Sequence, residues 1–313
     1  MRLVFAGTPE PAVVALQKLI HSEHEVVAVL TRPDARRGRG RTLHPSPVKA
    51  LAEANGIEVL TPESLRGNEE IRARLADIAP DAIPVVAYGN LIPEDMLDIP
   101  RHGWVNLHFS LLPQWRGAAP VQAAIKNGDV TTGATTFRID PGLDTGDILG
   151  TVGEDIGPRD TADDLLTRLA HAGAGLLVDT MTALETGAVT PVSQPAEGTY
   201  ARKITPADAQ VSWSQPAVEI DRAIRAHTPG PGAWTTWEGQ RVKLGPVEPT
   251  DVSGSAGLGP GEVRAEKNAV YVGTGTTEVR LGTVQPPGKK MMDAAAWARG
   301  LHADVIEQGV VFQ

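Results

Sequence analysis

The chain of 313 residues contains no cysteine, and this absence excludes a disulfide scaffold, a cysteine-ligated zinc site and a thiol nucleophile. No stretch reaches the roughly 18 consecutive apolar residues that a membrane helix needs. Gly7 and Pro9 interrupt the apolar N-terminal run before a signal core could form. The eight histidines form no His-x-x-x-His pair, so no metal site is expected. These absences predict a cytoplasmic protein without a membrane segment.

Positively charged residues are also fewer than negatively charged ones. The chain has 29 Lys and Arg against 38 Asp and Glu, a net charge of -9, which argues against general binding to nucleic acids. Any contact with a polyanion must therefore be local. Because a single hydrophobic core stops growing beyond about 250–300 residues, the length of the chain predicts two domains.

Short apolar runs alternate with segments of helical spacing over the first part of the chain. The predicted strands are 2–7, 26–30, 57–60, 82–87, 104–107, 133–139 and 148–156, and the predicted helices are 11–20, 46–55, 68–78 and 161–185. This alternation predicts an α/β fold with a parallel sheet covered on both faces. Pro84 removes a ladder donor, so its strand is expected to be irregular.

The periodic pattern stops after about residue 185. Pro and Gly without periodicity then predict a linker over 190–207, between domains at 1–189 and 208–313. In the second domain a helix at 217–226 precedes short alternating runs, which predict a small β-barrel or sandwich.

Polar side chains follow the predicted strand 104–107. Asn106 and His108 are alternate residues, so they share one face of that strand, and ligands bind beyond the carboxyl ends of strands in open parallel sheets. The turn 140–147 carries Asp144 after the next predicted strand and could approach the same crevice. An amide, an imidazole and a carboxylate suit acyl transfer to an amine. A structural histidine and an Asp that bonds its own turn are the alternatives.

These residues carry a resemblance to a known family. The run Ser110–Pro120, preceded by Asn106-x-His108 and followed by Gly142-Leu-Asp-Thr-Gly-Asp147, resembles the methionyl-tRNA formyltransferases. Further similar segments occur in the family's order: 5–10, 31–34, 45–49, 86–89, 228–230 and 287–290. The resemblance implies a Rossmann-like formyltransferase domain followed by an OB-like barrel. It also implies transfer of a formyl group from 10-formyltetrahydrofolate to the α-amine of initiator methionyl-tRNA, by a monomer.

The resemblance assigns roles to individual residues. Asp144 would orient His108 and favour its protonated form, while Asn106 and His108 would hydrogen-bond the formyl oxygen. Whether His108 or a bridging water removes the amine proton stays open. The folate site implied by the family consists of Val86, Tyr88, Gly89, Ser110, Leu111, Leu112 and Pro113. Asn90 stands where the family usually has an apolar residue.

A basic segment is the candidate contact with tRNA. Residues 32–41 hold five arginines with two glycines between them, which predicts a flexible basic loop able to meet phosphates. A solvated surface loop is the ordinary alternative. The resemblance favours tRNA contacts by Arg36, Arg37, Arg39, Arg41, Lys289 and Lys290.

Two other functions remain open at this point. Formyltransferases that act on amino-sugar nucleotides resemble the same first domain, although the basic loop and the lysine pair favour tRNA. A non-catalytic RNA-binding protein of the same fold is expected to have lost part of the trio Asn106, His108 and Asp144, whereas this chain retains all three.

Overall fold

A computed structural model describes residues 1–38, 41–253, 257–301 and 309–313. The chain forms two compact units. The first contains residues 1–120, 131–155 and 166–201, and the second contains residues 121–130, 156–165 and 202–313. The domain and linker boundaries expected from the sequence stay a prediction.

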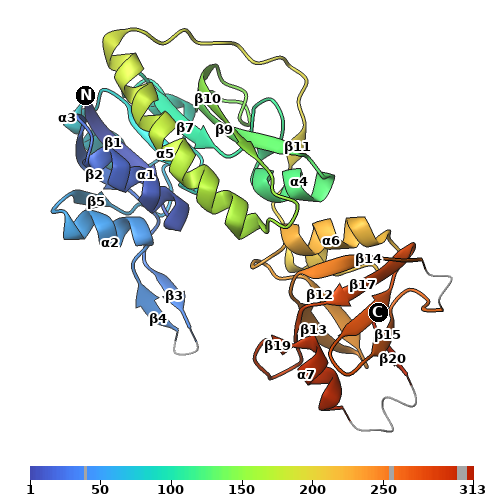
Figure 1. The fold of residues 1–313 in the computed structure, drawn as a ribbon. Coiled ribbons are helices and arrows are strands. Elements are labelled where there is room, and N and C mark those ends of the chain that lie inside the picture. The colour runs from blue at the N-terminus through green and yellow to red at the C-terminus, as the bar shows by residue number, and fades with distance from the viewer. Residues whose placement is uncertain (39–40, 254–256, 302–308) are drawn as a thin grey trace. The chain divides into compact units, whose positions relative to one another are not determined.

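A mainly parallel sheet is the frame of the first unit (Figure 1). Across the sheet the order is β10 (Ile148–Asp155), β9 (Thr131–Arg138), β7 (Trp104–His108), β6 (Ile83–Val86), β1 (Arg2–Gly7), β2 (Glu25–Leu30) and β5 (Glu58–Leu60). The pairs from β7 to β5 are parallel, whereas β9 is antiparallel to both β7 and β10. Chain direction therefore reverses on one side of the sheet only.

Helices cover both faces of this sheet because its strands are apolar on both sides. Along β1, Leu3 and Phe5 enter one core and Val4 and Ala6 enter the other. The first core is closed by α1 (Glu10–Ile20), α2 (Pro47–Ala54) and α5 (Ala162–Thr186), and the second by α3 (Glu69–Ile78) and the short helix η1 (Glu94–Met96). Figure 1 shows α5 running across its face of the sheet.

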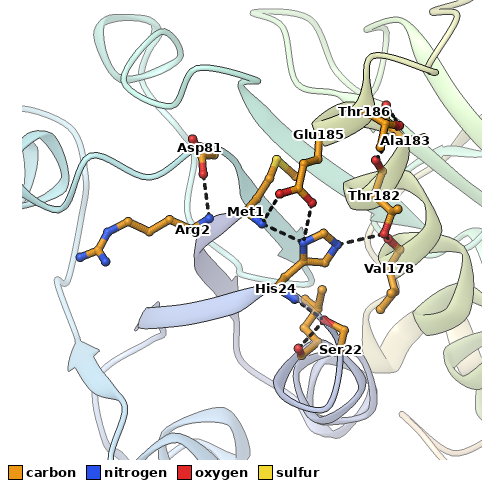
Figure 2. Close-up of polar contacts among 11 residues, drawn as sticks. Met1, Arg2, Ser22, His24, Asp81, Val178, Thr182, Ala183, Glu185 and Thr186 are labelled. Carbon is orange, nitrogen blue, oxygen red and sulfur yellow. Dashed lines mark hydrogen bonds and ion pairs between the residues drawn. The ribbon is translucent and has the colours of Figure 1, made fainter.

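A polar cluster ties α5 to the start of the sheet (Figure 2). The α-amino group of Met1 lies 2.9 Å from Glu185 Oε1 and 3.1 Å from His24 Nδ1, and His24 Nε2 lies 3.1 Å from Thr182 Oγ1. Burial and the neighbouring ammonium lower the pKa of His24. A neutral His24 can then accept from Met1 and donate to Thr182.

The basic segment of the first unit contains a β-hairpin. β3 (Ala35–Arg37) pairs with β4 (Thr42–His44), and Figure 1 shows the two strands projecting from the loop after β2. The ordered pairing replaces the irregular loop expected from the glycines, because residues 35–37 and 42–44 satisfy each other's backbone groups.

The second unit is built mainly of antiparallel strands around its own core. One sheet has the order β12 (Trp234–Trp237), β13 (Gln240–Leu244), β18 (Thr283–Gln285) and β19 (Met292–Asp293). Another has the order β14 (Val247–Ser253), β17 (Thr277–Leu281), β16 (Val270–Gly273), β15 (Glu262–Ala265) and β20 (Val310–Val311). Among the described residues, this unit includes residues 121–127 of α4 (Pro120–Asn127), the first turn of α5, the short helix η2 (Pro206–Ala209), α6 (Ala217–Ala226) and α7 (Ala294–Arg299). Trp213, Trp297 and Phe312 stack within the core.

The predicted fold class is confirmed: a Rossmann-like, mainly parallel sheet and a second unit of antiparallel strands. Pro84 lies inside β6, opposite Val105 of β7, and the strand is kept. The sheet is not wholly parallel, because β9 and β10 form an antiparallel pair. Only nine residues (139–147) separate β9 from β10, too few for the helical crossover that a parallel pair requires.

Candidate active site

Strand β7 places two polar side chains on one face. Trp104 is buried in the core closed by α3, and Asn106 and His108 continue the same face because side chains alternate along a strand. Asn106 is half-buried and His108 is buried, so both lie where the strand leaves the apolar core. The structure thus has both side chains on one face of β7, as the alternation in the sequence predicts.

The imidazole of His108 has a defined orientation. Its Nε2 lies 2.8 Å from the carbonyl oxygen of Trp115. Because a carbonyl oxygen can only accept, Nε2 carries a proton, and in the neutral ring the lone pair is therefore on Nδ1. Burial lowers the pKa of His108 below its ordinary value, against the opposing effects of the Asp144 carboxylate and the Trp115 carbonyl. His108 is thus mainly neutral near pH 7, with Nδ1 able to accept a proton.

Asp144 faces the free nitrogen of that ring. Its Oδ2 lies 3.8 Å from His108 Nδ1 and accepts a 2.7 Å hydrogen bond from the backbone amide of Gly117. The φ angle of Asp144 is +54°, a left-handed conformation that costs free energy for any residue but glycine. The structure therefore brings together the His and the Asp that lie 36 positions apart in the sequence.

The loop that carries Asp144 is tightly closed. Asp140 Oδ1 accepts from the amide of Gly142 and from the hydroxyl of Thr145. At Gly146 a Cβ atom would lie 1.7 Å from the carbonyl oxygen of Arg138, so this position has no room for a side chain. The spacing Gly142-Leu-Asp-Thr-Gly146 is thus the sequence that permits this turn.

Replacing Gly146 by alanine is expected to lower the free energy of unfolding by about 1–3 kcal/mol, because the loop must move to admit the methyl group. Gly153→Ala on β10 is the matched control, since a Cβ there meets no atom within 4 Å. Thermal unfolding of both variants checks this expectation. Equal unfolding temperatures would contradict the close approach at Gly146.

A cavity of about 480 Å³ opens beside these groups, and Asn106, His108 and Asp144 all line it. Its size is within the usual range for small-molecule sites. The remaining walls come from the ends of β6, β7 and β9 and from the segments that follow these three strands. They comprise Val85, Ala87, Tyr88, Gly89, Asn90, Leu91, Ile92, Leu107, Phe109, Gly117, Ala118, Pro120, Phe137, Ile139, Asp140, Pro141, Gly142 and Leu143.

The cavity includes two of the residues that the sequence assigns to folate. Tyr88 and Gly89 line it, whereas Val86 and residues 110–113 are not part of this lining. Val86 is in the sheet core, Ser110 donates to the carbonyl of Gln114, and the amide of Leu112 donates to Thr135. These contacts shape the loop after β7. The folate-binding set stays a prediction.

The sequence predicts that the turn 140–147 could approach the crevice, but it assigns neither residues 90–92 nor residues 139–143 to the cavity wall. Residues 90–92 and 139–143 line it, and Leu91 and Leu143 are exposed there although they are apolar. Asn90, the departure from the family pattern, accepts from Arg32 and donates to the hydroxyl of Tyr88 over 3.3 Å. The apolar residues beside the Asp144 turn were the feature of the sequence that could have indicated this cavity wall.

The candidate tRNA contacts are on exposed segments of both units. Arg36 lies in β3 and Arg41 directly precedes β4; both are exposed, and Arg36 donates to the carbonyl of Arg41. Arg37 belongs to β3, and Arg39 lies outside the described residues. Lys289 and Lys290 are exposed after β18 in the second unit. Their contacts with tRNA stay a prediction.

The described parts of the chain hold neither a metal-binding cluster nor a membrane-spanning helix. Within residues 1–38, 41–253, 257–301 and 309–313, no group of three or more His, Asp or Glu side chains could hold a metal ion. Over the same ranges, every helix is too short or too polar to cross a membrane.

Comparisons with known proteins agree over nearly the whole chain. The family model described as formyl transferase matches residues 1–181, and the model for the formyl transferase C-terminal domain matches residues 203–302. A methionyl-tRNA formyltransferase of Corynebacterium glutamicum is 67% identical over 309 residues, covering 97% of this chain and 98% of that protein. The corresponding protein of Acidothermus cellulolyticus is 58% identical, with 96% and 97% covered.

Solved structures share the fold. An N-formyltransferase from Helicobacter canadensis, in complex with folinic acid and dTDP-3-aminofucose, matches with a TM-score of 0.67 and 18% identity, covering 89% of this chain and 97% of that one. HypX from Aquifex aeolicus in complex with tetrahydrofolic acid has a TM-score of 0.63 and 18% identity, with 96% and 47% covered. The full-length identities to the curated relatives decide the family. The chain belongs to the methionyl-tRNA formyltransferases.

Proposed function

We propose that this protein transfers the formyl group of 10-formyltetrahydrofolate to the α-amine of initiator methionyl-tRNA. The observation that carries the proposal is the joint presence of Asn106, His108 and Asp144 in one cavity of a chain with 67% full-length identity to such an enzyme. The sugar N-formyltransferases share this fold at 18% identity, which is too low to favour their substrate. A cytoplasmic monomer stays a prediction.

In the proposed reaction the amine nitrogen attacks the formyl carbon. The new C–N bond forms and the formyl oxygen becomes negative in the tetrahedral intermediate. Neutral His108 accepts the amine proton at Nδ1, and the Asp144 carboxylate 3.8 Å away stabilises the resulting imidazolium. The carbonyl then re-forms, the bond from carbon to the folate nitrogen breaks with its electron pair going to that nitrogen, and the imidazolium returns the proton to it, which gives tetrahydrofolate and neutral His108. This assignment favours His108 over a bridging water as the proton acceptor.

Asn106 is the proposed donor to the developing oxyanion. The neutral ring of His108 has a single N–H, and that group already donates to Trp115, so it has none left for the formyl oxygen. The side-chain amide of Asn106 lines the same cavity and can supply the hydrogen bond. This replaces the shared role that the resemblance implies for Asn106 and His108.

We place the folate co-substrate against the cavity walls at residues 87–92 and 139–143. Backbone amides and carbonyls in these irregular segments can pair with a pterin edge, and Leu91 and Leu143 offer apolar surface to its rings. The previously expected Val86, Ser110, Leu111, Leu112 and Pro113 support the walls from behind in this proposal.

The substrate can be tested directly. The protein is incubated with 10-formyltetrahydrofolate and either methionyl initiator tRNA or a dTDP-linked amino sugar, and formylated product is measured. Product from the tRNA alone supports the proposal, and product from the sugar contradicts it. Failure with both acceptors would favour a non-catalytic RNA-binding protein.

Arg39→Ala is expected to weaken tRNA binding without changing folate binding, because the basic segment 32–41 is proposed to meet the phosphates. If one phosphate contact is lost, the slope of log affinity against log salt concentration falls by about one. Filter binding across a salt series measures both quantities. Arg66→Ala, at an exposed arginine of the first unit outside the basic segment, is the control. Identical salt slopes for Arg39→Ala and the wild type would exclude the contact.

A further inference from the structure

Part of the segment expected to be a linker is hydrogen-bonded to the first unit. Val192 and Ile148 exchange two backbone hydrogen bonds of 2.8 and 2.9 Å. Farther along, β11 (Tyr200–Ala201) pairs in parallel with β8 (Arg116–Gly117). Residues 192–201, here called the strap, thus run from the edge of the sheet to the loop after β7.

One end of the strap holds the loop of Asp144. The side-chain amide of Gln194 donates from Nε2 to the carbonyl oxygen of Asp144 over 3.0 Å and to that of Gly146 over 2.7 Å. Its Oε1 accepts from Arg116 Nη2 over 3.0 Å. Since Asp144 is in a left-handed conformation, hydrogen bonds that fix its carbonyl also help to maintain that conformation.

The other end of the strap holds the loop that orients His108. Thr199 Oγ1 accepts a 2.8 Å hydrogen bond from the amide of Trp115, and the Thr199 carbonyl accepts one of 2.8 Å from the amide of Arg116. The carbonyl of Trp115 is the group that accepts from His108 Nε2. Trp115 has a φ of +58° and so also needs support in the left-handed region.

Arg116 connects the two ends. Its side chain is 1% exposed, and its partners in the described chain are uncharged: Gln194, the carbonyl oxygens of Pro195 and Ala196, and the hydroxyl of Tyr200. Burying a cation without a carboxylate is costly. At Gly198 a Cβ would lie 2.6 Å from the carbonyl of Pro113, so the strap is packed directly on the loop.

We propose that Gln194 and Thr199 are positioning residues of the active site: from one strap they hold Asp144 and the Trp115 carbonyl, and so fix His108 from both of its ring nitrogens. The inference rests on the proposed function, because it gives the strap its role through the proton transfer at His108. Neither residue needs to touch a substrate.

Gln194→Glu separates positioning from stability. The carboxylate keeps the acceptor for Arg116 and adds an ion pair, but it presents an oxygen instead of an N–H to the carbonyls of Asp144 and Gly146. We expect kcat to fall roughly 10- to 100-fold, the scale of a small misplacement of reacting groups, with KM for both substrates within about twofold. The unfolding temperature should not fall. Gln17→Glu on α1, at an exposed glutamine of the same unit, is the matched control.

Thr199→Val removes the acceptor for the Trp115 amide at nearly constant volume, and Thr199→Ser keeps it. The hydrogen bond from His108 to Trp115 raises the pKa of His108, so its loosening in Thr199→Val should lower that pKa, while Asp144 continues to act on the ring. NMR titration of the His108 ring measures this shift without any turnover. The pH dependence of kcat should move in the same direction, and Thr199→Ser should behave as the wild type.

The outcomes are distinct for the two proposals. If the wild type formylates tRNA but Gln194→Glu keeps its kcat, and Thr199→Val and Thr199→Ser titrate alike, the strap has no positioning role. If the wild type fails to formylate tRNA, the proposed function is wrong. The NMR titration then still decides whether the strap orients His108.

Discussion

His108→Ala is expected to lower kcat by about 10³-fold, since general base catalysis by a positioned side chain contributes roughly 10²- to 10⁴-fold. The variant loses the proton acceptor at Nδ1 and the imidazolium that Asp144 stabilises. Folate affinity should change little, because most of the cavity wall is formed by Val85 and residues 87–92 and 139–143. Single-turnover measurements at saturating substrates isolate the chemical step from binding.

The control for this variant is His171→Ala, at an exposed histidine of α5 that is not part of the cavity lining. It should retain the wild-type kcat. A His108→Ala enzyme with more than about a tenth of the wild-type single-turnover rate would assign the proton transfer to water, which is the alternative that the sequence leaves open.

Local pattern predicted the parts of the site that depend on local geometry. The alternation Asn106-x-His108 after a buried Trp104 is sufficient to put both side chains on one face of β7. The turn from Gly142 to Gly146 is likewise predicted by its sequence, because a glycine at each end permits a tight turn. These elements could be predicted because strand periodicity and turn chemistry act within a few residues.

The remaining parts of the site depend on contacts that leave no periodic signal. Gln194 and Thr199 act through backbone carbonyls and amides of residues about 50 and 84 positions away, and any sequence supplies such groups. The Pro- and Gly-rich segment around them therefore resembles a linker. The wall at residues 90–92 is likewise irregular and has no periodic signal, so only the structure shows that it lines the same cavity as the turn 140–147.

The location of the site follows from the order of the strands. β1 pairs with β2 on one side and with β6 on the other, so the chain changes direction across the sheet beside β1. Crevices form at the carboxyl ends of strands near such a switch point. The ends of β6 and β7 supply residues 87–92 and His108 to the cavity. The loop 139–147 between β9 and β10 folds back so that Asp144 lies beside His108.

Asp144→Asn is expected to lower kcat by roughly 10²-fold while leaving the loop in place. The asparagine oxygen can still accept from the amide of Gly117, and the volume is unchanged. What is lost is the negative charge beside Nδ1. The imidazolium formed by proton transfer is then less stable, so the maximal rate falls.

The same variant should also shift the pH profile, in a direction fixed by the charge. His108 must be neutral to accept a proton, so activity is lost on acidification as the ring becomes protonated, with a midpoint below the ordinary pKa of 6.5 because burial lowers the pKa of His108. The Asp144 carboxylate opposes that lowering. Removing its charge must therefore lower the pKa of His108 further and extend the acid limb to lower pH, even as the plateau falls.

Profiles of kcat from about pH 5 to 9 for both enzymes measure this shift, and titration of the substrate amine is common to the two and cancels in the comparison. Asp140→Asn is the matched control: Asp140 lies in the same loop and lines the same cavity, but among the carboxylates that the structure describes it is Asp144 that affects the pKa of His108. An acid limb that stays in place in Asp144→Asn, or moves to higher pH, would contradict the role of neutral His108 as the base. A shift that appears equally in Asp140→Asn would instead assign it to the general negative charge of the loop.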